Sequence, residues 1–419
     1  MPSRPSAPTR SASADSSAAP FAGASSCYAP ADLDQPTPLL GGLTPTQFMR
    51  RYWHRKPLLI RQAVPPGKPV IDRTTLFKLA DLDDVESRLI TRPRKRGGEP
   101  GWALEHGPFA PDELPGLKTR LWTLLVQGVN LHHAPADALM NRFRFLSDAR
   151  LDDVMVSYAS DGGGVGPHFD SYDVFLLQVQ GKRRWRISTQ KDLTLNSGLP
   201  LKVLQNFVPE HEWLLEPGDM LYLPPHVAHD GIAEGEALTA SIGFRAPQAD
   251  EIRGQFLYRL AEHCADRPGR AQRYADAGQA PTSEPGRIPP HMVEKMGEMI
   301  AKIRWNQADI ADFVGSYLSE PKPNVFFEPP VKPLSAAAFA TRLQRRGAHL
   351  DPKTRLLYDA SCAYVNGETL RLVGGLKKTV QTLANHRALG PQSSVTLSHD
   401  SSVTQLLYEW YCAGWMHLN

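Results

Sequence analysis

The pattern of hydrophobic and polar positions divides the chain into segments of different character. Between residues 152 and 244, short apolar runs are separated by Gly, Pro and Asp turns. Many short strands with little helix between them are typical of a barrel or jelly roll, and not of a parallel α/β sheet. The predicted strands comprise residues 154–158, 174–180, 184–187, 213–215, 220–223 and 237–243.

Helical signals precede this region. Thr44 is placed to cap a short helix that continues to Trp53, with Pro45 at its first position and Gln47 completing a capping box. A strand is predicted at residues 56–60. Leucines at helical spacing then predict a second helix over residues 73–90.

After Pro247 the apolar positions return to helical spacing. One stripe covers residues 252–264 and a second covers residues 292–303, with a polar loop at 267–287 between them. Such paired amphipathic helices suit either a core or a dimer interface, and the sequence alone does not separate the two. From about residue 304, helices at 310–318 and 370–385 mix with strand-like pieces and indicate a small separate α+β module.

The composition narrows the class of protein. A length of 419 residues suits two or three domains, and 41% hydrophobic with 22% charged residues is typical of a globular protein. The net charge of +3 is too small to imply nucleic-acid binding by itself. Four well-separated cysteines without a CxxC pair favour reduced thiols in a cytoplasmic protein over disulfides or structural zinc. No apolar run has the length of a membrane span.

Two segments have compositions that favour irregular structure. Residues 1–36 are rich in Ser, Ala and Pro, which predicts a disordered tail. Arg4 and Arg10, without an acidic residue before Asp15, also fit the alternative of an organellar transit peptide. The basic run at residues 92–96 is interpreted as a solvated loop, or alternatively as a contact for a negatively charged partner.

The candidate chemistry centres on a His-x-Asp triplet. In an extended strand His168 and Asp170 point to the same face. A second histidine would complete a two-histidine, one-carboxylate facial triad, which holds Fe(II) and leaves positions open for oxygen and a co-substrate. The segment 220–225 leads to His226 and His229, and either could be the third ligand.

Two neighbouring features bear on this prediction. The glycine-rich residues 162–166 have no Walker lysine, so they favour a tight backbone approach over phosphate binding. Lys182, Arg183 or Arg184 could bind the distal carboxylate of 2-oxoglutarate, which an arginine does through two parallel charge-assisted hydrogen bonds. The alternative for these three cations is the solvated end of a hairpin.

Together these motifs resemble the bacterial JmjC-type ribosomal oxygenases, particularly the branch of arginine hydroxylases. The resemblance runs from about residue 38 to the C-terminus and implies an α+β fold: a double-stranded β-helix (cupin/JmjC jelly roll), a helical dimerisation region and a winged-helix-like domain. The implied limits are 1–36 for the tail, 37–250 for the catalytic domain, 251–304 for the helical region and 305–419 for the winged helix. The resembling segments are residues 52–58, 163–170, 172–175, 183–186, 217–225, 229–231 and 241–247.

Carried over by position, the resemblance assigns the iron ligands to His168, Asp170 and His229. It places Arg183 and Ser157 at the 2-oxoglutarate site.

Three positions depart from the family pattern. His226 stands where the family tends to have glycine, so the resemblance makes it a neighbour and not a ligand. Ala159 and Thr239, near the expected site, also differ.

The activity implied by the resemblance is hydroxylation of an arginine β-carbon in large-subunit ribosomal protein sixteen, with Fe(II), 2-oxoglutarate and O2. The enzyme would act as a cytoplasmic homodimer, without nucleic acid as its direct substrate. Alternatives are the same chemistry on a histidine or methylated residue, or a non-catalytic cupin that binds through its winged helix. A basic substrate calls for acidic groups nearby, for which the candidates are Asp161, Asp173 and Asp230.

Overall fold

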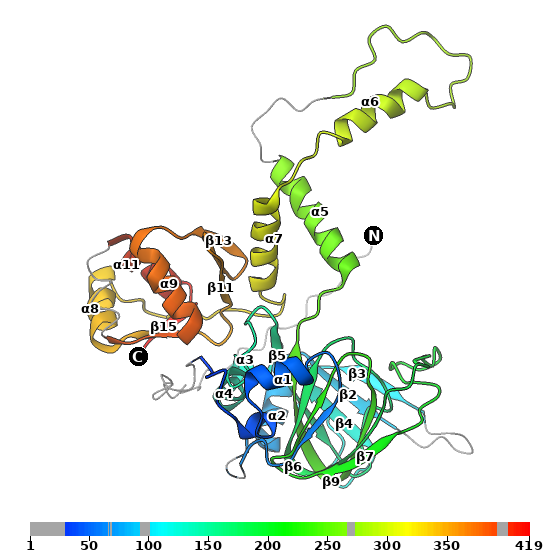
Figure 1. The fold of residues 1–419 in the computed structure, drawn as a ribbon, viewed down its shortest axis with the longest axis vertical. Helices are drawn as coiled ribbons and strands as arrows, with labels where there is room; N and C mark the ends of the chain where they lie inside the picture. The colour runs from blue at the N-terminus through cyan, green and yellow to red at the C-terminus, as the bar shows by residue number, and fades with distance from the viewer. Residues whose placement is uncertain (1–29, 66, 68, 93–100, 266–272, 392–400) are drawn as a thin grey trace.

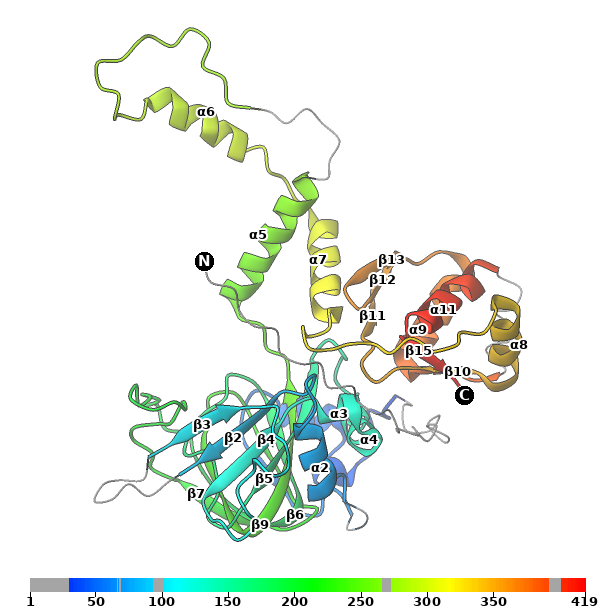
Figure 2. The same cartoon turned by 180° about the vertical axis from the view of Figure 1, so that it is seen from behind.

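The structure is a computed structural model that describes residues 30–65, 67, 69–92, 101–265, 273–391 and 401–419. A curved sheet with covering helices forms the largest unit, a helical arm projects from it, and a second α/β unit lies beside it (Figures 1 and 2). No helix in these described ranges is long and apolar enough to cross a membrane. Residues 1–29 of the predicted tail and residues 93–96 of the basic run lie outside the described residues.

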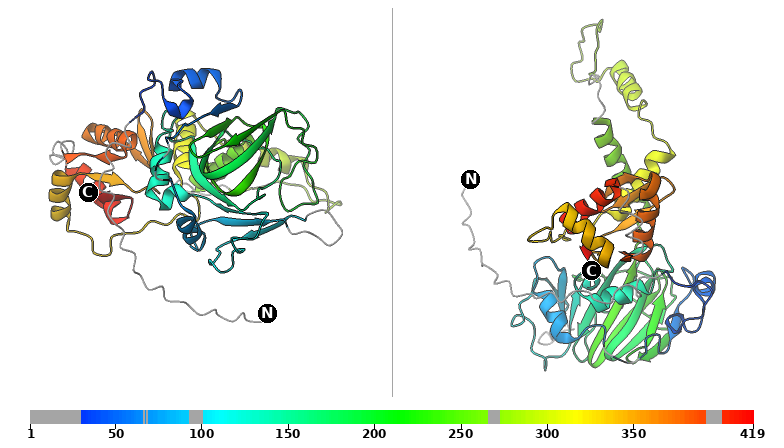
Figure 3. Two further views of the ribbon diagram at one scale, coloured as in Figure 1. Left: turned by 90° about the horizontal axis from the view of Figure 1, so that it is seen from below. Right: turned by 90° about the vertical axis from the view of Figure 1, so that its left-hand side faces the viewer.

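Among the described residues, nine strands form one antiparallel sheet that curves into a barrel (Figure 3). Its order is β1-β8-β6-β9-β5-β4-β2-β3, and β7 also pairs with β6. The strands are β1 (Leu58–Ile60), β2 (Ser87–Thr91), β3 (Ala103–His106), β4 (Trp122–Val126), β5 (Leu151–Ala159), β6 (Val174–Ser188), β7 (His211–Leu215), β8 (Met220–Leu223) and β9 (Ala228–Phe244).

The two faces of this sheet have different chemistry. On the outer face, residues such as Tyr158, Leu238 and Phe175 pack in one large apolar cluster with Phe48 of a covering helix and with Phe143, which lies in a turn. The helices of this unit are the 3-10 helix η2 (Pro38–Leu40), α1 (Pro45–Arg51), α2 (Arg73–Ala80), α3 (Val129–His132) and α4 (Ala134–Asn141).

Because side chains alternate along a strand, the residues between these apolar positions face the inside of the barrel. Ser157 on β5 and Thr239 on β9 lie opposite each other there, and both are buried. The apolar part of the inside includes Leu176, Trp185 and Ile187 on β6. Polar residues are therefore buried on the inner face, where a site can use them.

Strand β6 changes its register twice. Its pairing with β9 is irregular between Gln178 and Gln180 and again between Gln180 and Lys182. Gln178 faces inward, since it lies opposite Thr239 and accepts a hydrogen bond of 2.9 Å from the Thr239 hydroxyl. After the irregularities, the odd-numbered Arg183, Trp185 and Ile187 face inward instead.

The arm is formed by α5 (Ala249–Ala265), α6 (Pro290–Ile300) and α7 (Gln307–Ser319). Helix α7 begins at a capping box formed by Asn306 and Asp309. Phe256 of α5 packs on Phe313 of α7, with ring centroids 5.3 Å apart. Helix α6 buries none of its residues and lies at the far end of the arm (Figure 1).

The second unit has its own core, in which Phe339, Leu383 and Trp410 are buried together. Within the described residues, two three-stranded antiparallel sheets, β14-β10-β15 and β11-β12-β13, pack with helices, and β11-β12-β13 also packs against α7 of the arm. The elements are α8 (Ala336–Arg346), β10 (Ala348–Leu350), β11 (Leu356–Tyr358), β12 (Cys362–Val365), β13 (Glu368–Arg371), α9 (Gly374–His386), β14 (Ala388–Leu389), α11 (Ser401–Cys412) and β15 (Met416–Leu418).

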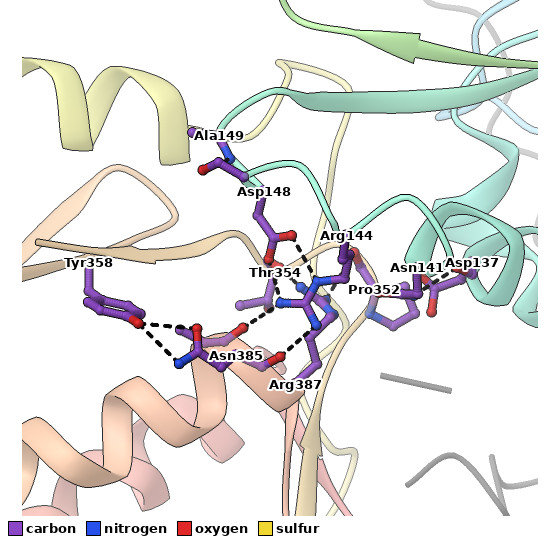
Figure 4. A network of polar contacts seen from close by, with 12 residues as sticks. Asp137, Asn141, Arg144, Asp148, Ala149, Pro352, Thr354, Tyr358, Asn385 and Arg387 are labelled. Carbon is purple, nitrogen blue, oxygen red and sulfur yellow. Dashed lines mark hydrogen bonds and ion pairs between the residues drawn. The ribbon is translucent and has the colours of Figure 1, made fainter. Parts of the chain in front are cut away.

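Arg144 ties the two units together. Its guanidinium forms two hydrogen bonds with the Asp148 carboxylate, of 2.8 and 2.7 Å. It also donates to the backbone carbonyls of Asn385 at 2.8 Å and Ala384 at 2.7 Å, in the last turn of α9 (Figure 4). A cation at a helix C-terminus satisfies carbonyls that lack partners within the helix.

A second arginine reaches the other way across the interface. Arg355 donates to the carbonyls of Leu151 at 3.2 Å and Asp152 at 2.9 Å at the start of β5. Lys322 adds an ion pair of 3.2 Å to the Asp152 carboxylate. Each unit therefore contributes cations that bind backbone carbonyls or carboxylates of the other unit.

Local signals predicted several elements correctly. The capping box of α1 has both of its predicted hydrogen bonds, Gln47 N to Thr44 Oγ1 and Thr44 N to Gln47 Oε1, each 3.1 Å. The helix ends at Arg51, slightly before the predicted Trp53. The helices predicted at 252–264, 292–303 and 310–318 correspond to α5, α6 and α7.

Other predictions were wrong in part. The helix predicted over 73–90 ends at Ala80, and the chain then forms β2, because residues 87–91 pair with both β3 and β4. Leu82, counted in the apolar stripe, is exposed. The helix predicted at 370–385 starts only at Gly374, after β13. The runs 174–180 and 184–187 form one continuous strand, β6.

Candidate metal and co-substrate site

His168, Asp170 and His229 come together at one end of the barrel. One ligand atom from each of the three side chains lies within 4.8 Å of the others. The His168 and His229 ring centroids are 4.2 Å apart, and His229 Nε2 is 3.7 Å from Asp170 Oδ2. Two imidazoles and one carboxylate at this spacing fit a single metal ion with an open side.

The backbone near these residues fixes the orientation of both histidines. His168 Nδ1 lies 2.9 Å from the Gly166 carbonyl, and His229 Nδ1 lies 2.9 Å from the Val227 carbonyl. Because a carbonyl only accepts hydrogen bonds, each Nδ1 carries a hydrogen and each Nε2 presents a lone pair. Burial, reinforced by His168, lowers the pKa of His229 to about 4, so its ring is neutral at pH 7 as a metal ligand requires.

His168 is held by pairing with β9, although it does not lie in a regular strand as predicted. It forms an isolated antiparallel bridge with His229, with N···O distances of 2.9 and 2.8 Å. The preceding glycines make this approach possible, since a Cβ on Gly164 would come within 2.6 Å of the Gly231 carbonyl. This agrees with the prediction of a tight backbone approach at residues 162–166.

The structure separates the two candidate histidines. Strand β8 ends at Leu223, and His226 follows in a turn with a left-handed φ of 65°. Its side chain is exposed and does not join the His168, Asp170 and His229 group. A left-handed backbone favours glycine, which accounts for the glycine expected at this position by resemblance.

Arg183 is the one cation of its triplet that enters the barrel. It is 4% exposed, and its Nη1 donates to Ser157 Oγ at 3.2 Å. Within the described part of the chain, its Nε and Nη2 are buried and have no hydrogen-bond partner. Burial lowers its pKa to about 10, partly offset by Asp230, so it stays charged at pH 7.

Lys182 and Arg184 have solvated positions on either side. Lys182 pairs with Glu216 at 2.6 Å, and Arg184 pairs with Glu212 at 2.7 Å and with Glu234. Thus two of the three cations form a solvated hairpin end, as one alternative predicted, and the third is a buried cation with two unpaired nitrogens.

The comparisons with known proteins identify the family. Residues 138–252 match the JmjC domain, and residues 302–417 match the ROXA-like winged helix. Over 362 residues the chain is 30% identical to the ribosomal protein uL16 3-hydroxylase of Escherichia coli K12, spanning 86% of this chain and 94% of that protein. The chain belongs to the JmjC-type ribosomal oxygenases.

Solved structures of ribosomal oxygenases agree with this membership. The X-ray structure of E. coli ycfD matches with a TM-score of 0.76 at 30% identity, over 90% of this chain and 98% of that one. A YcfD structure in complex with cobalt and 2-oxoglutarate has a TM-score of 0.74 at 29% identity, with the same coverage. This ribosomal oxygenase is accordingly an enzyme of the 2-oxoglutarate-dependent class, with a cupin/JmjC barrel and a winged-helix domain.

The three acidic candidates of this ribosomal oxygenase all have partners within the fold. Asp173 is fully buried, and its carboxylate accepts the Tyr222 hydroxyl at 2.6 Å, which makes contact with a substrate implausible. Asp230 is also buried and pairs with Arg186 at 2.5 Å. Asp161 is the most accessible of the three and pairs with Arg120 at 2.6 Å.

The inner residues near Arg183 were missed as a group by the sequence reasoning. Ala159, Ala233 and Ala237 form a small buried cluster, and Ala233 lies directly opposite Arg183 on β9. Small side chains here leave room beside the guanidinium. The signal lay in the alternation of β5 and β9, but the alternation alone does not say which face is the inside.

Proposed function

We propose that this protein is an Fe(II)- and 2-oxoglutarate-dependent hydroxylase that oxidises the β-carbon of an arginine in a large-subunit ribosomal protein. The observation that supports it most is the shared inner face of β6 and β9, which carries His229 at one level and Arg183 at another. Ile187 lies opposite His229, so four residues separate the two levels, roughly 13 Å at about 3.3 Å per residue. This separation suits a short dicarboxylate that is bound by a metal at one end and by a cation at the other.

In this proposal each side chain has a defined task. His168 and His229 would bind Fe(II) through Nε2, and Asp170 through its carboxylate. Arg183 and Ser157 would bind the distal carboxylate of 2-oxoglutarate, giving the unpaired guanidinium nitrogens their partner. The bound iron, with 2-oxoglutarate and O2, supplies the oxidation of an unactivated C–H bond. The protein contributes positioning and exclusion of water.

The choice of substrate rests on the relatives. The E. coli relative is named for 3-hydroxylation of ribosomal protein uL16, and the human relative is named ribosomal oxygenase 1. By resemblance, an arginine at position 183 favours the arginine-hydroxylase branch over histidine hydroxylases and demethylases.

A direct assay tests the proposal. The purified protein is incubated with Fe(II), 2-oxoglutarate and ribosomal protein or its arginine-bearing peptides. The expected products are succinate and a peptide with one added oxygen, located on arginine by fragmentation in mass spectrometry. His229→Ala should abolish both products, while His226→Ala serves as the matched control and should retain them. Oxidation of a histidine would replace the substrate proposal, and no succinate from wild type would overturn the function.

We also infer that the arm forms a homodimer interface. Helices α5 and α6 expose large apolar side chains that a monomer would leave in water: Leu257 is 59%, Val293 61% and Ile300 68% exposed. A second copy of the same arm is the occupant that a symmetric dimer provides. The domain limits 37–250, 251–304 and 305–419 and the cytoplasmic location stay predictions.

Sedimentation of the full chain tests the dimer. Wild type should sediment as a dimer, and Val293→Asp with Ile300→Asp should sediment as a monomer. Glu298→Gln, an exposed change on the same helix, is the control and should remain dimeric. A monomeric wild type, or a dimer that survives both aspartates, contradicts the assignment.

A further inference from the structure

Between the metal-binding level and the Arg183 level, the inner face carries a tryptophan paired with a glycine. Along β6 and β9, Ile187 lies opposite His229, Trp185 opposite Gly231, and Arg183 opposite Ala233. The Trp185 and Gly231 pair therefore lies midway between the two ends of the proposed co-substrate site. Trp185 is 5% exposed, and its ring centroid is 5.9 Å from that of His229.

Gly231 is required by the tryptophan and not by its own backbone. It lies within β9 and has no left-handed φ. A Cβ at this position would come within 2.7 Å of two atoms at the outer edge of the Trp185 ring, Cη2 and Cζ3. The indole is thus seated directly over the Gly231 backbone, where any other residue would push it further into the barrel.

The same indole carries an unpaired polar group. Within the described residues, Trp185 Nε1 is buried and has no hydrogen-bond partner. The Arg183 guanidinium lies 5.8 Å from the Trp185 ring, and its Nε and Nη2 are unpaired as well. Buried donors without partners are rare in folded proteins, and a group of them on one inner face indicates a bound acceptor.

We infer that Trp185, seated on Gly231, is a positioning and specificity residue for the 2-oxo acid. Its ring forms the wall against which the carbon chain of the co-substrate lies, between the metal end and the Arg183 end. Its N–H supplies a further donor to a carboxylate oxygen. The pair thereby sets the width of the space and selects a five-carbon dicarboxylate. This inference rests on the proposed function.

The experiment measures binding without turnover. Calorimetry under argon with the full-length protein and Mn(II) gives the Kd for 2-oxoglutarate and for 2-oxoadipate, which is one methylene longer. Trp185→Phe should weaken 2-oxoglutarate binding about tenfold, the factor expected when two methylenes lose their packing partner. It should also reduce the preference for 2-oxoglutarate over 2-oxoadipate, which a purely structural role would not change.

Gly231→Ala gives an independent test of the same wall. It should weaken 2-oxoglutarate binding by displacing the indole, and the double change with Trp185→Phe should recover part of the loss, because phenylalanine lacks the outer ring. Gly243→Ala is the matched control: Gly243 is on the same strand and inner face, and a Cβ there finds its nearest neighbour at 3.7 Å.

The outcomes separate this inference from the proposed function. If wild type binds 2-oxoglutarate but Trp185→Phe and Gly231→Ala both behave like Gly243→Ala, Trp185 has no such role and the inference is overturned. If wild type with Mn(II) does not bind 2-oxoglutarate, the proposed function fails and the inference fails with it. Thermal unfolding of each ligand-free variant reports whether it is folded, and an unfolded Gly231→Ala leaves the decision to the selectivity of Trp185→Phe.

Discussion

Replacing Arg183 by methionine should abolish co-substrate binding while leaving the ligand-free protein as stable as wild type, or more stable. Arg183 is buried with two unpaired nitrogens, so its charge is a cost to the ligand-free fold. Burial lowers its pKa from 12.5 to about 10. At about 1.4 kcal/mol per pKa unit, that charge costs roughly 3 kcal/mol at pH 7. Methionine keeps a long apolar side chain and removes the charge.

The two effects have opposite signs, and this makes the prediction specific. We expect the free energy of unfolding to be unchanged or to increase by about 1–2 kcal/mol, since some packing is lost as the charge is removed. Two hydrogen bonds to a charged group contribute on the order of 3 kcal/mol or more, so the Kd for 2-oxoglutarate should rise at least about 100-fold.

Urea unfolding of the ligand-free protein and calorimetry with Mn(II) and 2-oxoglutarate measure both quantities. Arg184→Met is the control, because Arg184 is the exposed neighbour paired with Glu212 and Glu234. It should leave the Kd unchanged and lower stability by about 1 kcal/mol or less. A methionine at 183 that destabilises the fold by several kcal/mol and still binds 2-oxoglutarate like wild type would refute the reasoning.

Three further predictions concern the surroundings of the site. His226→Gly should raise the free energy of unfolding by about 1 kcal/mol, because it relieves a left-handed residue, and should keep turnover, whereas loss of turnover would make His226 part of the site. Arg144→Ala should lower the free energy of unfolding by about 1–3 kcal/mol and speed amide exchange near residues 384–389, since the last-turn carbonyls of α9 lose their charged donor; unchanged exchange would show that the two units do not depend on this contact. Because burial lowers the pKa of His229 from 6.5 to about 4, the unfolded state binds a proton in this range before the folded state does. Urea titrations of the metal-free protein should therefore show stability falling as the pH drops from about 6.5 to about 4, with a smaller fall in His229→Gln.

Local interactions explain which elements the sequence could predict. The capping box at Thr44 and Gln47 joins residues three positions apart, so a short stretch of sequence contains both partners of the interaction. The short apolar runs at 154–158 and 220–223, bounded by turn residues, likewise indicated the strands β5 and β8. By contrast, residues 87–91 continue a leucine spacing that suits a helix, and only their pairing with β3 and β4 makes them a strand. That pairing depends on residues 12 or more positions away, which periodicity does not include.

The site shows the same division. The His168 and Asp170 spacing indicated a metal, and resemblance selected His229 as the partner. His226 is excluded because its side chain is exposed and does not join His168, Asp170 and His229, and composition does not predict where the turn after β8 places it. Trp185 was present in a matched motif but had no assigned role, because its importance comes from lying opposite Gly231 on a strand more than forty residues later.

The alternation of side chains along β6 decides which of its three consecutive cations faces the inside of the barrel. The two irregularities between Gln178 and Lys182 shift the alternation by one, and only for that reason does Arg183 face the inside. A regular strand of the same length, without this shift, would keep every iron-binding side chain and the same three cations. Yet it would turn Lys182 and Arg184 to the inside and Arg183 and Trp185 outward. The irregularity is therefore part of the candidate co-substrate site, and in comparisons among relatives the pairing of this segment carries as much information as the identity of its residues.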